Sequence, residues 1–361
     1  MKVLSILIVL LIGVMVLSSS SCSRYPTNPQ QKCDTCDTTT HPCDTCNIDK
    51  DSAAHAFIWT EYTIPGEVSL TGVWVFKPNE IIIVGNNLWE YTGGSTFTQI
   101  HTYNSKTSIT YDGSLNGYSV FATGLDTFWL VHGSVALHTN EGSVFEDNRP
   151  GNVNACWGPT ANDMFFVGNA GQIHHYDGTK FTDMISPTTK DLRSVWGTSH
   201  SDVWACGYNS SKGETVLLHY DGNSWKEDNI SVTNNTITGG FNAVWACDSS
   251  GHRFVATSGA LLIRKTDNGI WRSDSGLVPN RLDNGSFIGI GPSGNTANDF
   301  MTIGSWGFVA HWNGKTWKRY DELYDYGNPF YYAGGFSMKG NIACVVGRKG
   351  GSSWVAIGRR K

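Results

Sequence analysis

The sequence has few charged residues and lacks the common motifs by which many enzymes are identified. Only 16% of its 361 residues are Asp, Glu, Lys or Arg, and its net charge is −5 without a run of basic residues, whereas an average globular domain carries about 25% charged residues. Nucleophile elbows, phosphate-binding glycine motifs and metalloprotease helices are all absent. The missing basic footprint excludes nucleic acid as a partner, and no stretch has the 3.6-residue apolar period of a helix.

Glycine and aromatic residues are abundant instead. The chain has 41 Gly, 14 Trp, 14 Tyr and 16 Phe. This composition favours short strands joined by tight turns. Length alone would suggest two or three domains, but all-β barrels and propellers often exceed that size as single units.

The first fifty residues predict export. Lys2 precedes an apolar stretch over Val3–Leu17, followed by four serines and Cys22; fifteen residues fit a secretory signal but not a membrane span. The segment resembles the lipobox of bacterial lipoproteins, although Ser19 stands where that family usually has Leu. The resemblance implies a signal peptide over 1–21, lipidation of Cys22 and an outer-membrane-anchored lipoprotein in the cell envelope, held in the membrane by the N-terminal lipid only. An ordinary cleaved secretory signal is the alternative.

Residues 22–52 predict a flexible tether, because they hold too few large apolar side chains to fold alone. A duplicated CDTC places four cysteines there: Cys33, Cys36, Cys43 and Cys46. Only six residues separate the two pairs, while zinc ribbons usually need about 12 to 20. In an oxidising envelope we expect disulfides or a simple spacer, with a metal site as the alternative.

Residues 53–361 contain a repeat. The clearest copies are 193–228 and 154–183, a third ends at 297–320, and weaker copies begin at 73, 118, 243 and 331. Between Gly85 and Gly347 the six intervals average about 44 residues, which is the period of a four-stranded propeller blade. Each copy divides into four short strands, with Asp-Gly or Asn-Gly predicting a two-residue hairpin before the last.

We therefore predict an all-β, seven-bladed β-propeller over 53–361, with six or eight blades as alternatives. The last copy has room for three strands only. Residues 57–60, FIWT, are expected to supply its fourth strand and to close the ring. The repeats resemble the BNR-like, kelch-like or YVTN-like propellers of bacterial exported proteins, and this resemblance implies a fold rather than a function.

Most repeated side chains are interpreted as structural. One repeat position holds His138, His175, His219 and His311; on different blades these cannot converge on one ion. The repeated Trp74, Trp157, Trp196 and Trp245 are expected to pack the core, with sugar stacking as the alternative. The repeated Asp163, Asp202 and Asp299 are assigned to turns. The propeller cysteines, Cys156, Cys206, Cys247 and Cys344, are expected to be unpaired and buried.

Two functions remain open from the sequence. The first is a monomeric, non-catalytic binding or scaffolding module for a protein or glycan of the cell envelope, without cofactor or bound metal in the propeller. The second is an envelope carbohydrate-active enzyme, a glycosidase or lyase, of the BNR/sialidase-like type that the resemblance implies. No catalytic or ligand-binding residue is identified for either.

Overall fold

The structure is a computed structural model. It describes residues 55–100, 102–104, 109–111, 119–124, 127–132, 135–140, 143–147, 151–209, 213–228, 230, 240–247, 253–257, 261–264, 271–273, 291–325 and 332–361. The chain divides into two compact units, Met1–Ile48 and Asp49–Lys361, and the described residues all belong to the second. The predicted signal, Cys22 and the four tether cysteines lie outside them. Within the described part, no helix has the length and hydropathy of a membrane span.

The described strands form seven sheets, six of them wholly antiparallel, together with three short 3-10 turns. Five sheets are regular blades, which we define as four strands consecutive in the chain. Their strands are β2 (Gly72–Lys77), β3 (Glu80–Val84), β4 (Leu88–Tyr91) and β5 (Phe97–Ile100); β12 (Val153–Thr160), β13 (Asp163–Gly168), β14 (Ile173–Tyr176) and β15 (Phe181–Asp183); β16 (Leu192–Ser199), β17 (Asp202–Asn209), β18 (Glu214–Tyr220) and β19 (Trp225–Glu227); β20 (Phe241–Ala246), β21 (Arg253–Thr257), β22 (Leu261–Arg264) and β23 (Trp271–Ser273); and β24 (Gly291–Thr296), β25 (Asp299–Ile303), β26 (Val309–Trp312) and β27 (Trp317–Arg319). The 3-10 turns are η1 (Asn169–Gly171), η2 (Ser305–Gly307) and η3 (Asp321–Leu323).

The other two sheets are built differently. One has six strands in the order β7-β6-β11-β10-β9-β8. Its strands are β6 (Thr102–Asn104), β7 (Ile109–Tyr111), β8 (Ser119–Ala122), β9 (Phe128–His132), β10 (Val135–Asn140) and β11 (Ser143–Asp147). The other combines the C-terminal strands β28 (Tyr332–Lys339), β29 (Ile342–Lys349) and β30 (Ser352–Arg360) with the N-terminal β1 (Phe57–Tyr62).

The prediction of seven equivalent blades is therefore wrong, as are the alternatives of six and eight: five blades have the predicted form. The repeat pattern predicted no strand between residue 100 and the copy that begins at residue 118. The structure instead adds the β6/β7 hairpin to the outer edge of one sheet, through a parallel pairing of Asn104 with Val144. Short alternating segments can extend an exposed edge strand in this way without a counterpart in the other repeats.

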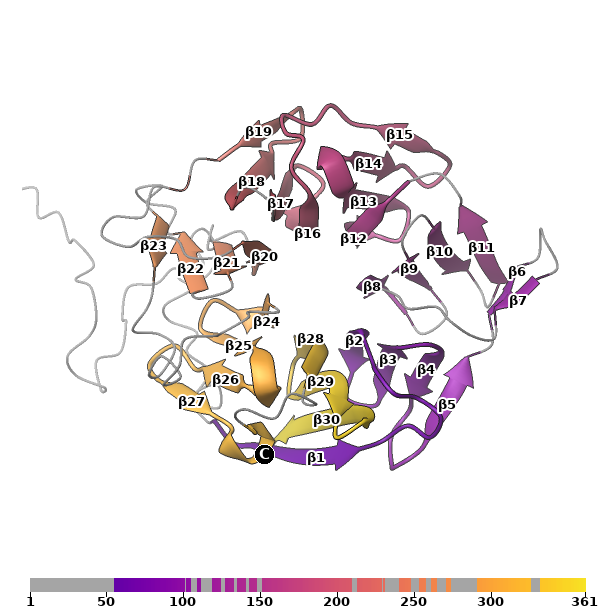
Figure 1. Cartoon of the computed structure of the whole chain (residues 1–361), viewed down its shortest axis with the longest axis vertical. Helices are drawn as coiled ribbons and strands as arrows, with labels where there is room; N and C mark the ends of the chain where they lie inside the picture. Colours follow the sequence, from indigo (N-terminus) through magenta and orange to yellow (C-terminus); the bar gives the residue numbers. More distant parts are fainter. Residues whose placement is uncertain are drawn as a thin grey trace, which may run out of the picture. The chain divides into compact units, whose positions relative to one another are not determined.

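The sheets close into a ring, and the expected N-terminal strand is confirmed. The first strands of successive sheets contact one another in the cycle β2, β8, β12, β16, β20, β24, β28 and back to β2, so these strands surround the centre (Figure 1). Strand β1 pairs with β30 over its whole length, from Phe57 opposite Arg360 to Tyr62 opposite Val355. The first and last described strands thus join in one sheet, which closes the ring.

The core lies between adjacent sheets and is rich in aromatic residues. Trp157 and Trp245 of the repeated tryptophans are buried, as expected, whereas Trp74 and Trp196 are only partly buried. Gly168 and Gly207 show why a glycine recurs near the end of the second strand. A Cβ atom on Gly207 would lie 1.9 Å from the carbonyl oxygen of Asp191, and one on Gly168 would lie 2.1 Å from that of Asn152. The segment entering the first strand crosses directly over this backbone.

The predicted two-residue hairpins are wrong. In the β14–β15 connection Tyr176 pairs with Phe181, so the loop has four residues. The side chain of Asp177 accepts hydrogen bonds from the backbone N–H groups of Thr179 and Lys180, both at 2.9 Å. Within this loop, Gly178 alone has a positive φ, of 89°. The Asp side chain therefore completes an Asx-type turn, and the glycine is needed at the second position only.

Candidate functional site

The topology gathers two sets of connections at one end of the ring. Strands within a blade are antiparallel, so the segment leading into the first strand and the loop between the second and third strands lie at the same end. We call it the entry end. Gly168 and Gly207, with the backbone that crosses them, belong to it. The turn between the first and second strands lies at the opposite, exit end.

A hollow of about 210 Å³ opens between the first strands. Every sheet contributes to its wall. Its lining residues are Thr71, Gly72, Val73, Trp74, Ser119, Val120, Asn154, Ala155, Cys156, Arg193, Ser194, Val195, Trp196, Asn242, Ala243, Val244, Gly291, Pro292, Ser293, Gly334, Gly335, Phe336 and Ser337. It is therefore the central channel of the propeller, and Arg193 is the one charged side chain among these residues.

Four lining residues sit at interruptions of the strand pairing. The register between first and second strands shifts at Asn154, Arg193, Asn242 and Gly334, near the entry end of β12, β16, β20 and β28. Such β-bulges redirect a side chain relative to the regular alternation and are common at the rims of barrels and next to binding sites. These bulges put two asparagines, one arginine and one glycine at equivalent positions of the ring. The entry end therefore carries residues that break its symmetry.

Arg193 is exposed at this rim. Its guanidinium lies 4.3 Å from the ring centroid of Tyr208, which follows the crossed glycine of β17. The cation–π contact orients the side chain without neutralising its charge. Asn154, by contrast, is held by two hydrogen bonds from its Nδ2 atom, to Asn169 Oδ1 at 2.9 Å and to the Leu192 carbonyl at 2.8 Å.

Most hydroxyl groups around the hollow have a structural task. Ser194, Ser293 and Ser337 each accept a backbone N–H from the next first strand, at 3.0 to 3.1 Å. They satisfy donors that neighbouring sheets leave without a ladder partner. The polar groups available to a ligand are consequently concentrated at the bulge positions.

Two tryptophans meet inside the hollow. The ring centroids of Trp74 and Trp196 lie 5.8 Å apart, although β2 and β16 belong to sheets that are not neighbours. Trp196 donates its indole N–H to the Ala246 carbonyl at 2.9 Å, which fixes the ring. The pair brings side chains of two non-adjacent sheets into contact inside the hollow. The sequence assigned both residues to the core, but their repeated position did not reveal this partial exposure.

Backbone strain accompanies the entry end. Ala170 in η1 and Trp306 in η2 have φ values of 54° and 56°, and both turns join the second strand of a regular blade to the third. Left-handed backbone is unusual for a residue other than glycine and tends to mark functional surfaces. At Ala170 the backbone N–H donates to Asp191 Oδ1 at 3.0 Å, which stabilises the turn.

The repeated Asp and His residues are partners of one another. Asp163 bonds to His175 at 2.6 Å, Asp202 to His219 at 2.9 Å and Asp299 to His311 at 2.8 Å. Each pair joins the start of the second strand to the third strand of the same blade. The sequence analysis interpreted the Asp and the His residues separately as structural, and the assignment of each Asp to its own turn missed the histidine. His138 instead stacks on Trp129, with ring centroids 4.4 Å apart.

Two of these carboxylates are held ionised. Burial alone would raise the pKa of Asp299, but hydrogen bonds from His311, Arg360 and Asn295 outweigh it and lower that pKa to about 2. At Asp202 burial is likewise outweighed, by His219, Thr198 and Arg253, so that its pKa also falls. Both carboxylates are engaged by their neighbours, which does not suit them to transfer protons at neutral pH.

Three of the four described propeller thiols are unsuited to chemistry. Cys156, Cys206 and Cys344 are buried free cysteines, as expected, whereas Cys247 is only partly buried, so the expectation of burial is wrong there. Burial raises the pKa of Cys156 to about 12, and it raises the pKa values of Cys206 and Cys344 as well. Thiols rather than thiolates are therefore present, and they act as small apolar core residues.

Comparisons with known proteins show the fold. No family model and no curated protein matches this chain. Among solved structures, YCF48 bound to D1 peptide matches with a TM-score of 0.61 and 18% identity, over 86% of this chain and 97% of that one. YCF48 from Cyanidioschyzon merolae matches with a TM-score of 0.58 and 16% identity, over 84% and 98%. These matches support the β-propeller fold, whereas nothing in them supports the BNR-like or kelch-like assignment.

Proposed function

We propose that this chain is a non-catalytic binding module that captures a peptide segment of a partner protein at the entry end of its channel. The observation that carries the proposal is the set of bulge residues around the central hollow, with Arg193 as the single charged lining side chain. The repeat explains the remaining polar groups as structural.

The size and charge of the hollow define the expected ligand. A volume of about 210 Å³ admits one or two side chains or a chain end but not a folded domain, because ligand pockets for drug-sized molecules span about 300–1,000 Å³. An exposed guanidinium favours a carboxylate, which it can bind through two parallel hydrogen bonds. We therefore expect an extended peptide with an acidic side chain or a free C-terminus. The peptide in the YCF48 structure is a precedent for the ligand class on this fold.

Peptide binding to the full chain tests this proposal. Fluorescent hexapeptide pools with a free C-terminal carboxylate, with a C-terminal amide, or with an acidic central residue are titrated and followed by anisotropy. We expect a carboxylate-bearing pool to bind, and Arg193→Gln to weaken its binding by about tenfold, as expected for a charged hydrogen bond worth about 1.5 kcal/mol or more. Arg319→Gln is the matched control, since Arg319 pairs with Asp321 outside the hollow. Equal binding by both variants would refute the site.

A carbohydrate-active enzyme is the second candidate, favoured by the partly exposed Trp74 and Trp196 in the hollow. Aromatic faces of this kind stack against sugar rings. Glycan-array binding and a hydrolysis screen distinguish the two candidates. Turnover that disappears when a channel-facing residue is changed would replace the peptide-binding proposal.

We further propose that Cys22 anchors the propeller to the outer membrane as a lipoprotein, with residues 23–52 as the tether. The sequence before Cys22 supports this proposal. Metabolic labelling with a fatty-acid analogue is expected to mark the chain and to disappear in Cys22→Ser but not in Cys33→Ser. Labelling that persists in Cys22→Ser would exclude the anchor.

A further inference from the structure

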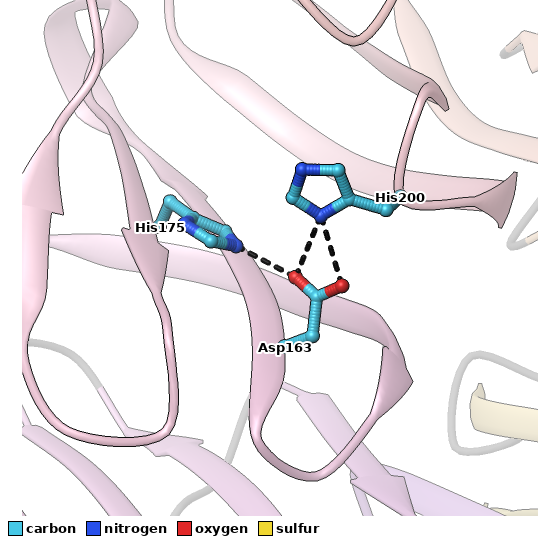
Figure 2. Close-up of side chains that lie close together, drawn as sticks. All are labelled: Asp163, His175 and His200. Carbon is cyan, nitrogen blue, oxygen red and sulfur yellow. Dashed lines mark hydrogen bonds and ion pairs between the residues drawn. The ribbon is translucent and has the colours of Figure 1, made fainter.

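One carboxylate on the exit end has two imidazoles bound to it. Asp163 begins β13, His175 lies in β14 of the same blade, and His200 lies in the turn between β16 and β17 of the next blade (Figure 2). His175 Nε2 is 2.6 Å from Asp163 Oδ1, and His200 Nδ1 is 3.0 and 2.9 Å from the two carboxylate oxygens. One ligand atom from each residue lies within 4.8 Å of the others.

The other two Asp–His pairs are completed by arginine. Asp202 binds Arg253 of β21, and Asp299 binds Arg360 of β30. In all three cases the third group comes from the following sheet, although from a different strand or turn each time. Arginine always carries a charge and cannot ligate a metal, whereas imidazole is among the commonest metal ligands in proteins. The His200 position is therefore the one of these three at which a metal ion can take the place of the guanidinium.

The cluster is accessible and preorganised. The side chains of Asp163, His175 and His200 are 26%, 19% and 52% exposed, so an ion can enter and keep a water ligand. Phe165 lies under both imidazoles, with centroid distances of 4.7 Å to His175 and 5.7 Å to His200. The two imidazole rings are 5.3 Å apart and nearly perpendicular. These contacts fix the rings while leaving one side open to solvent.

We propose that Asp163, His175 and His200 bind a divalent transition metal, with Zn²⁺ as the reference ion, between two neighbouring blades. Two imidazole nitrogens and one carboxylate with an open fourth position match a three-ligand zinc site. Ligand atoms at about 2.0–2.1 Å from a tetrahedral ion lie about 3.3 Å from each other. The observed N–O contacts, 2.6 Å at His175 and 2.9 to 3.0 Å at His200, would widen by about 0.3 to 0.7 Å to reach this spacing, and the two ring nitrogens lie within 4.8 Å of each other. Metal binding replaces the two N–H to carboxylate hydrogen bonds, and each neutral imidazole then carries its N–H on the ring nitrogen that faces away from the ion.

Zinc titration of the full chain tests this proposal, which does not depend on the peptide-binding proposal. The parent carries Cys33→Ser, Cys36→Ser, Cys43→Ser and Cys46→Ser, so that the tether thiols do not compete. Calorimetry with Zn²⁺ is expected to give one ion per chain. Absence of stoichiometric Zn²⁺ binding by this parent would overturn the proposal.

Two single changes locate the site. His200→Arg installs the arginine that completes the other two pairs; it is expected to weaken Zn²⁺ binding by about 100-fold or more, since loss of even an outer-shell partner costs about 10–100-fold. His174→Asn is the matched control, because His174 is adjacent to the cluster but bonds to Asp183; it should leave the affinity unchanged. Zn²⁺ is expected to raise the thermal midpoint of the parent and of His174→Asn but not of His200→Arg.

Other outcomes would contradict this assignment of the ligands. Unchanged affinity in His200→Arg, or an equal loss in His174→Asn, would place the ion elsewhere. His175→Gln serves as the second ligand variant should His200→Arg fail to fold: it must also lose the ion. A Co²⁺ titration of the parent adds an independent measurement, since a two-imidazole, one-carboxylate site gives visible d–d absorption that Zn²⁺ abolishes.

Discussion

The ion pair between Asp299 and Arg360 is predicted to secure the closure of the ring. Arg360 is the last residue of β30, the strand that pairs with the N-terminal β1, and Asp299 begins β25 in the preceding blade. The side chains of Arg360, Asp299 and His311 are 6%, 8% and 0% exposed. The guanidinium also lies 4.7 Å from the ring centroid of Phe57 in β1. One cation thus connects both chain ends to the neighbouring blade.

The magnitude follows from this burial. Arg360→Met removes the cation but leaves a buried carboxylate with only His311 and Asn295 as partners. Removing one member of a buried pair costs about 3–5 kcal/mol, because the other charge loses its compensation. Asp299→Leu leaves the buried guanidinium without its carboxylate partner and should lower the free energy of unfolding by a similar amount. The double variant replaces both charges by apolar groups. Its loss in free energy of unfolding is expected to be about 2 kcal/mol smaller than the sum of the losses in the two single variants.

Urea unfolding followed by tryptophan fluorescence measures these losses. Arg319→Met is the matched control: its partner Asp321 is 71% exposed, so we expect a loss below about 1 kcal/mol. An Arg360→Met variant that loses no more than this control would refute the assignment. Additive losses in the double variant would show that the two side chains do not stabilise the ring as a pair.

Acid unfolding examines the same pair from the carboxylate side. The pKa of Asp299, ordinarily 3.8, is about 2 in the folded protein: burial acts to raise it, but hydrogen bonds from His311 and Arg360 lower it by more. The folded-state pKa lies below the unfolded one, so its stabilisation is present above about pH 4 and is lost as the pH falls towards 2. A shift of this size corresponds to about 2 kcal/mol. In Asp299→Leu this part of the acid dependence should vanish, and its persistence would contradict the assignment.

Two further predictions concern the fold. Gly207→Ala places a Cβ 1.9 Å from the Asp191 carbonyl and should lower the thermal midpoint strongly, whereas Gly72→Ala, whose nearest contact would be 3.5 Å, should not; equal midpoints would show that the crossing backbone can move. Cys156, with its pKa raised to about 12 by burial, should resist iodoacetamide in the native protein at pH 8 and react only in urea, as peptide mass mapping would show. Rapid native alkylation there would contradict its burial.

The sequence predicts the β-repeat because its signals are local. A glycine under a crossing backbone and a first-strand tryptophan recur at fixed distances within each unit, as at Gly207 and Trp196. The closing strand could be predicted for the same reason, since the last unit lacks its fourth strand. The six-stranded sheet could not, because the pairing of Asn104 with Val144 has no equivalent in other units.

Contacts between blades could not be predicted from the sequence. His200 reaches Asp163 from 37 residues away, and Arg360 reaches Asp299 from 61 residues away, each from a different place in its own unit. No fixed spacing marks such partners. The bulge positions did leave a signal: Asn154, Arg193 and Asn242 precede a repeated apolar run, and the residue is Asn in two copies but Arg in the third. Variation at one position of an otherwise regular repeat is what a binding rim would require.

The two proposed sites lie at opposite ends of a single strand. Arg193 is the second residue of β16, and His200 follows its last residue, Ser199. Seven residues of extended chain span about 23 Å, so a ligand at the entry end cannot touch an ion at the exit end. A metal there would join the β12–β13 turn to that of β16–β17, as Arg253 and Arg360 join their own pairs of sheets. It would thereby stabilise the strand that presents Arg193 without changing the chemistry of the rim. Peptide affinity should therefore survive His200→Arg, and Zn²⁺ affinity should survive Arg193→Gln, which separates the two proposals experimentally.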